Sequence, residues 1–67
     1  MNELNHDIER VKQEIDFNTN LGNSFAYLYE RELQSTDWSE LISWFKNLGY
    51  RVEVDDYDYW KVLKILW

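Results

Sequence analysis

The chain has 67 residues and carries thirteen Asp and Glu against seven Lys and Arg, which gives a formal net charge of −6. It has no Cys and one His, which excludes a disulfide scaffold, a Cys/His zinc site and a thiol nucleophile. No apolar run approaches the ~20 residues of a membrane span, and no signal-peptide core follows Met1. We therefore expect one small cytoplasmic domain over residues 1–67.

The first predicted element is an amphipathic helix over residues 2–16. Its apolar residues recur at spacings of four, three and four and share one face: Leu4, Ile8, Val11 and Ile15. Polar residues fill the other positions, so we expect Asp7 to face solvent with them. The Asn and Gly residues of 18–23 tolerate left-handed backbone, which predicts the first loop there.

Two more helices are predicted before the pattern changes. A helix over 23–34 would gather four apolar residues on one face: Phe25, Leu28, Tyr29 and Leu33. A third helix begins after a capping-box pattern, in which Asp37 or Thr36 caps the first free amides and Glu40 follows Asp37 by three residues. Its apolar face contains core residues such as Trp38, and Gly49 ends it as the C′ residue, with Tyr50 packing back on the last turn.

After Gly49 the apolar period changes from 3.6 to 2, which predicts a strand over 50–55, a turn over 55–58 and a strand over 59–67. The last strand has apolar residues on both faces: Leu63, Ile65 and Trp67 on one, and Trp60, Val62 and Leu66 on the other. A hairpin of this kind is expected to be covered on both faces or to pair with another chain. The predicted fold is α+β, with three short helices followed by a C-terminal antiparallel β-hairpin in a single small domain.

Catalytic patterns are missing from the sequence. His6 is predicted to be an exposed helix residue rather than a general base, because a chain this short seldom forms the pocket that a base needs. The sequence contains neither a Gly-rich phosphate loop nor a Gly-x-Ser-x-Gly turn, and its acidic turn lacks the Gly and terminal Glu of a calcium loop. We therefore expect no enzyme activity, no cofactor and no bound metal.

The densest charge in the chain lies on the predicted hairpin, and it has two interpretations. The acidic residues are Glu53, Asp55, Asp56 and Asp58. In the first interpretation they form a negative patch that takes the place of nucleic-acid phosphates on a basic protein, with Tyr57 and Tyr59 as contact anchors and Trp44 and Trp60 as apolar anchors. In the second they are a solvated turn that keeps an edge strand from aggregating.

Two runs near the end of the chain occur as a pair: Leu48-Gly49-Tyr50-Arg51-Val52 and, after a short turn, Val62-Leu63-Lys64-Ile65-Leu66-Trp67. They resemble the ending of small accessory proteins encoded by bacteriophages of Gram-positive hosts, in which a helix closes on a Gly-Tyr pair and a final hairpin ends on Trp. The resemblance covers about the last thirty residues. It implies a small α+β fold and a role in host takeover or in blocking a host defence system by binding one of its proteins. It implies no catalytic residues.

These patterns lead to one hypothesis and one alternative. The hypothesis is a small acidic phage-type inhibitor that occludes a host protein with a basic surface, by steric and electrostatic contact. Its net negative charge argues against direct binding to nucleic acid or to anionic membrane. The alternative is a structural homo-oligomer that assembles through the C-terminal strand.

Overall fold

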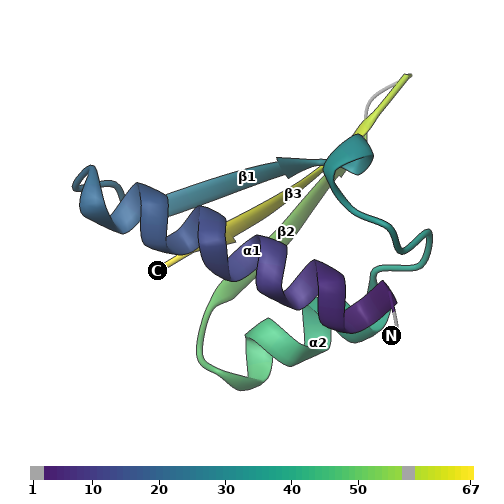
Figure 1. Ribbon diagram of the computed structural model, residues 1–67, viewed down its shortest axis with the longest axis horizontal. Helices are drawn as coiled ribbons and strands as arrows, with labels where there is room; N and C mark the ends of the chain where they lie inside the picture. The colour runs from purple at the N-terminus through teal and green to yellow at the C-terminus, as the bar shows by residue number, and fades with distance from the viewer. Residues whose placement is uncertain (1–2, 57–58) are drawn as a thin grey trace.

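The computed structural model describes residues 3–56 and 59–67 and has the predicted α+β composition (Figure 1). Its elements in chain order are α1 (Glu3–Asn20), β1 (Phe25–Tyr29), the 3₁₀ helix η1 (Glu30–Glu32), α2 (Ser39–Asn47), β2 (Arg51–Asp56) and β3 (Lys61–Leu66). The described residues thus form two α-helices and not the predicted three. The three strands form one sheet rather than an isolated C-terminal hairpin.

The sheet has the strand order β1-β3-β2, and both neighbouring pairs are antiparallel. The predicted hairpin exists as the β2–β3 pair, in which Val52 lies opposite Ile65. Strand β1 pairs along the other edge of β3, with Leu28 opposite Leu63. The last strand of the chain is therefore the central strand of the sheet, and both of its hydrogen-bonding edges are occupied within the molecule.

The predicted helix over 23–34 is wrong, because residues 25–29 form strand β1. Side chains alternate along this segment, with Ala26 and Leu28 fully buried while the aromatic residues between and beside them are exposed. That alternation is the period of two expected of a strand with one covered face. The only helical residues in this stretch are the three of η1 (Glu30–Glu32).

Helix α1 extends four residues beyond the predicted end at residue 16 and stops at Asn20. Gly22 has a positive φ of 83°, and the amide of Asn23 donates to the carbonyl of Asn18 at 2.8 Å. This arrangement is a Schellman motif, in which a residue in left-handed conformation closes the helix. The predicted loop therefore begins later, and its Gly is the helix stop signal.

The end of α2 agrees with the predicted signal, but the predicted capping box is wrong, because Trp38 is the N-cap residue and makes no side-chain cap hydrogen bond. At the start, the Asp37 carboxylate accepts hydrogen bonds from the Ser39 amide at 3.0 Å and the Ser39 hydroxyl at 2.6 Å. At the end, Gly49 has a φ of 97°, and the amide of Tyr50 donates to the carbonyl of Phe45 at 3.2 Å. The rings of Phe45 and Tyr50 pack edge to face at 5.8 Å between centroids, so Tyr50 does fold back on the last turn.

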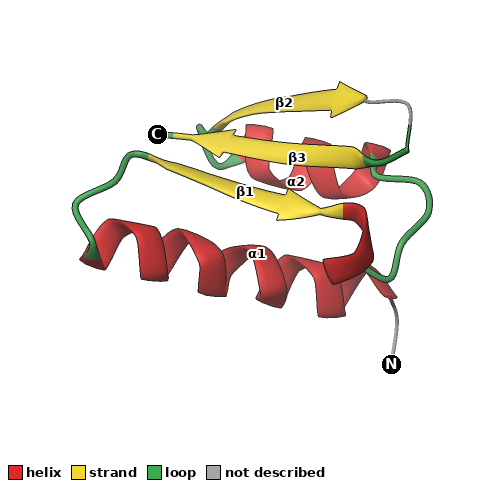
Figure 2. Cartoon of the chain, turned by 90° about the horizontal axis from the view of Figure 1, so that it is seen from above, coloured by secondary structure: helices red, strands yellow, loops and turns green. Residues whose placement is uncertain are grey.

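The core lies between one face of the sheet and the two helices. Helix α1 contributes the buried residues of its predicted stripe, and α2 contributes Leu41 and Phe45 beside the buried Trp38. The sheet contributes its inward side chains to the same cluster: Ala26, Leu28, Val52, Leu63 and Ile65. Figure 2 shows α2 behind β3 and α1 running alongside β1. Both helices therefore cover the same face of the sheet.

Asp7 is a further correction to the sequence analysis, because this residue is fully buried rather than solvated. Its two carboxylate oxygens accept hydrogen bonds from the backbone amides of Gln34 and Ser35, each at 2.8 Å. Burial alone raises the pKa of Asp7, but the bonds from Gln34 and Ser35, with the nearby charge of His6, outweigh it and hold the pKa below its usual value. Asp7 thus fastens the segment between η1 and α2 to α1.

Candidate protein-binding surface

The face of the sheet opposite the helices is covered by no other element of the described chain. We call it the open face and define it by the outward side chains of the three strands: Phe25, Tyr27 and Tyr29 of β1, Val62, Lys64 and Leu66 of β3, and Arg51, Glu53 and Asp55 of β2. The strand register places them in three rows across the sheet, which begin at Phe25, Tyr27 and Tyr29. One edge of the open face is therefore aromatic, its centre is mixed and its other edge is charged.

The aromatic edge consists of three rings from β1 that remain partly exposed, at 39% for Phe25, 46% for Tyr27 and 42% for Tyr29. Phe25 and Tyr27 stack on each other, with 5.1 Å between ring centroids. Val62 in the central strand is only 8% exposed, although it does not belong to the core cluster. The three rings form an apolar edge that this chain leaves in contact with solvent, and Val62 lies beneath them.

The charged edge is a ladder of ion pairs rather than a uniform acidic patch. Glu53 lies 2.9 Å from Arg51, and Lys64 lies 3.2 Å from Asp55 and 3.9 Å from Glu53. The hydrogen bond between Lys64 and Asp55, together with the charges of Asp55 and Glu53, raises the pKa of the Lys64 ammonium above its usual value. Two of the predicted acidic contact residues are thus already paired with cations of the sheet.

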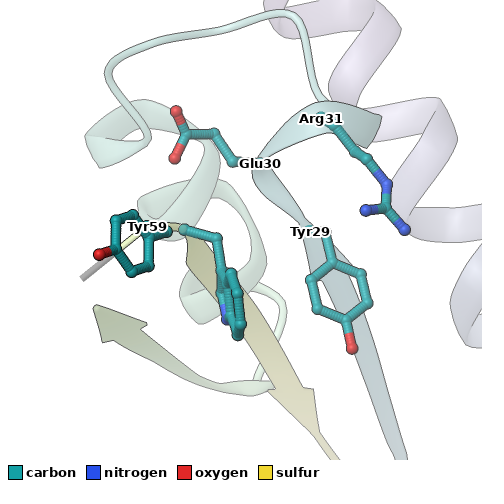
Figure 3. Close-up of a pocket in the computed structure, with 5 residues that line it drawn as sticks. Tyr29, Glu30, Arg31 and Tyr59 are labelled. Atoms are coloured by element: carbon teal, nitrogen blue, oxygen red, sulfur yellow. The ribbon is translucent and has the colours of Figure 1, made fainter. Parts of the chain in front are cut away.

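At one end of the open face the surface is hollowed. The hollow has a volume of about 660 Å³ and is lined by Tyr29, Glu30, Arg31, Tyr59 and Trp60. A neighbouring depression continues along the sheet and shares Tyr29 and Trp60 with it. Figure 3 shows that Tyr29 and Tyr59 come from different segments, the end of β1 and the residues just before β3. The hollow therefore forms only when β1 and β3 pair.

The structure separates the predicted contact residues into three groups. Glu53, Asp55, Tyr59 and Trp60 lie on or at the end of the open face. Asp56 is exposed at the end of β2, opposite Lys61. Trp44 belongs to α2 in the helical layer, where it packs against the core and carries Lys12 over its ring, so the structure does not bring it to the open face. Tyr57 and Asp58 lie outside the described residues.

The aromatic residues of β1 were missed as contact candidates. Tyr27 and Tyr29 were assigned to a helix, in which Tyr29 would have faced the core with Phe25. The signal that identifies them is the alternation of aromatic residues with Ala26 and Leu28, because it gives two chemically different faces to a strand.

Features of other functional classes are few in the part of the chain that the structure describes. His6 is exposed on α1. In residues 3–56 and 59–67, no three His, Asp or Glu side chains are grouped to hold a metal ion. Within the same residues, no helix combines the length and the apolar character needed to cross a membrane.

Comparisons with protein-family models, with curated proteins and with solved structures each found no match to this chain.

Proposed function

We propose that this chain is a non-catalytic binding protein that inhibits a host protein by covering a basic part of its surface with the open face. The observation that carries the proposal is the uncovered aromatic edge of the sheet, which Tyr59 and Trp60 extend at its end. Solvent-exposed apolar patches with a polar rim are typical of protein interaction sites. Tyr and Trp are also the residues most enriched among strong interface contacts.

Charge supports a basic partner. The chain has a net charge of −6, so its long-range field attracts positive surfaces and repels nucleic acid. One ion pair within β2, Arg51 with Glu53, and one between β3 and β2, Lys64 with Asp55, leave little net charge on the charged edge itself. We therefore expect the overall charge to accelerate association and the aromatic edge to supply most of the affinity. The assignment to a phage inhibitor of a host protein rests on the resemblance of the C-terminal runs.

The alternative, a homo-oligomer through the C-terminal strand, meets a constraint in the sheet. Both edges of β3 are paired within the molecule, so a second copy cannot add to this strand by backbone hydrogen bonds. Self-association would have to use the open face or the outer edges of β1 and β2. Two chains of net charge −6 also repel each other. These two facts favour a foreign partner.

The test is a binding experiment with matched variants. Nuclease-treated bacterial lysate is passed over the tagged chain, over a variant with Tyr27→Ser and Tyr29→Ser, and over a control with Phe17→Ser and Leu21→Ser. The control removes two apolar side chains that are also exposed, Phe17 in the last turn of α1 and Leu21 just after the helix. The retained protein is then purified, and its Kd for each variant is measured by calorimetry at low and high salt.

The expected result is a Kd raised at least about tenfold in the Tyr27/Tyr29 variant and changed less than about twofold in the control. Higher salt should weaken binding by the wild type, because steering by net charge is screened. Equal affinity of the two variants would contradict the proposal. Retention of the chain by itself alone, with a dimer seen in sedimentation, would replace the foreign partner with a second copy.

A further inference from the structure

The hollow at the end of the open face is lined by three aromatic residues and by two residues of opposite charge. Tyr29 ends β1, Glu30 and Arg31 begin η1, and Tyr59 and Trp60 precede β3. Tyr59 is 91% exposed, so its ring is open to a ligand from solvent. The volume of about 660 Å³ falls within the range of small-ligand pockets, roughly 300–1,000 Å³.

Aromatic rings elsewhere in this molecule are already partnered with cations. Lys12 lies over Trp44 at 5.1 Å, Lys61 over Trp38 at 5.7 Å, and Lys64 over Tyr27 at 5.8 Å. Arg31 lies 5.2 Å from the centre of the Tyr29 ring, at the border of the hollow itself. Ring faces attract cations because the π-system is negative above and below its plane. The exposed ring of Tyr59 offers further surface of the same kind to an external cation.

The two charged residues of the hollow point to different sides. In Figure 3 the Glu30 side chain extends toward the side of Tyr59, whereas Arg31 turns away to the side of Tyr29. Among the described residues, Glu30 takes part in none of the ion pairs, while Arg31 is engaged with the Tyr29 ring. The side of the hollow next to Tyr59 therefore combines an aromatic face with an available negative charge, which suits a cation and not an anion.

We propose that this hollow takes up the guanidinium group of an arginine on the partner protein, stacked on the Tyr59 ring and paired with Glu30. The proposal rests on the proposed function, because it names the anchor by which a basic partner is held. Guanidinium is planar and more weakly hydrated than ammonium, so stacking on a ring costs it less desolvation. A single arginine side chain of the partner would thus contact both a carboxylate and an aromatic ring of this chain.

The test uses N-acetyl-arginine methylamide as probe and N-acetyl-citrulline methylamide as its neutral isostere. Each probe is titrated into the intact ¹⁵N-labelled chain, and the shifts of the Trp60 indole N–H and the Tyr59 and Glu30 amides are followed by NMR. Citrulline keeps the planar end group and removes the charge, so the difference between the probes isolates the cation. The variants are Tyr59→Leu and Glu30→Gln. The control is Glu40→Gln, which removes an exposed carboxylate from α2.

The arginine probe should bind about two- to fivefold more tightly than the citrulline probe, as expected for a cation over an exposed ring. Tyr59→Leu and Glu30→Gln should each reduce this difference, and Glu40→Gln should leave it unchanged. Equal binding of the two probes, or equal effects of Glu30→Gln and Glu40→Gln, would overturn the proposal. Neither result would affect the partner test of Tyr27 and Tyr29, and a failed partner test would leave the probe titration valid.

Discussion

The two faces of the sheet use the same three strands for opposite purposes. On the covered face Ala26, Leu28, Leu63 and Ile65 have no exposed surface and belong to one cluster with the helices. On the open face the same strands present stacked rings and a ladder of ion pairs to solvent. The covered face of the sheet therefore supplies most of the stability, and the open face is the one available for binding.

The difference between the two faces is clearest in β3, where the adjacent buried residues Val62 and Leu63 point to opposite faces of the sheet. Leu63 is inaccessible and lies between Leu28 and Val54 in the covered layer. Val62 is 8% exposed and lies between Tyr29 and Asp55 on the open face. Low exposure of a side chain thus arises in two ways here: one residue is enclosed by the core, and the other is shielded by neighbouring side chains at the surface.

The largest expected effect is that of Leu63→Ala. Truncating a fully buried Leu leaves a cavity and lowers the free energy of unfolding by about 3 kcal/mol. Val62→Ala should cost about 1 kcal/mol or less, because surface side chains can close over the gap. Urea unfolding followed by Trp fluorescence measures both. Similar losses in the two variants would mean that the open face is as tightly packed as the covered one, which would contradict the division between them.

Asp7→Asn is the next largest change and tests the attachment of α1 to the segment before α2. The Asp7 carboxylate accepts one hydrogen bond from each of two backbone amides, those of Gln34 and Ser35. The Asn side chain has one oxygen and one NH₂ group, so one of these backbone amides loses its acceptor. We expect a loss of about 2 kcal/mol in unfolding free energy, or roughly 8–16 °C in Tm for a domain of this size. Asp16→Asn is the control, since Asp16 is an exposed residue of the same helix.

The pH dependence of unfolding checks the cause of this effect. The pKa of Asp7 in the folded state lies below the usual 3.8, so the carboxylate contributes its full stabilisation above about pH 5. That contribution is lost as the pH falls through 3.8 toward the folded-state pKa. The stability difference between the wild type and Asp7→Asn should therefore shrink on acidification. A constant difference from pH 7 to pH 2 would assign the effect to packing rather than to charge.

Much of the covered face could be predicted from the sequence because its signals are local. The stripe of α1, the helix stop at Gly49 and the alternation in residues 50–55 each follow from neighbouring residues. Residues 25–29 are apolar throughout, and such a short run satisfies both a helical and a strand period. The pairing that decides between them joins residues 25–29 to residues 62–66, far along the chain. Asp7 was missed for the same reason, because its partners lie 27 and 28 residues away.

The open face was only partly predictable. Glu53, Asp55, Tyr59 and Trp60 were candidates on account of the dense charge and aromatic residues of the hairpin, and they do lie on or beside this surface. The charge pattern alone did not indicate that Lys64 of β3 pairs with Asp55 of β2, because cross-strand neighbours depend on the register. The register of the three strands thus places cations and aromatic rings beside the carboxylates, so the surface is mixed rather than acidic.

Tyr27→Ser is expected to have the smallest effect on stability, although it removes more atoms than Leu63→Ala. The Tyr27 ring contacts Phe25 on the surface and lies 5.8 Å from the Lys64 ammonium, and nearly half of it is exposed. Cross-strand and surface contacts of this kind contribute about 0.5–1 kcal/mol. Urea unfolding should therefore leave this variant nearly as stable as the wild type. If it instead lost as much as Leu63→Ala, the aromatic edge would be a second core, and loss of partner binding by Tyr27 variants would reflect unfolding. A folded variant that no longer binds would place binding on the open face and stability on the covered one.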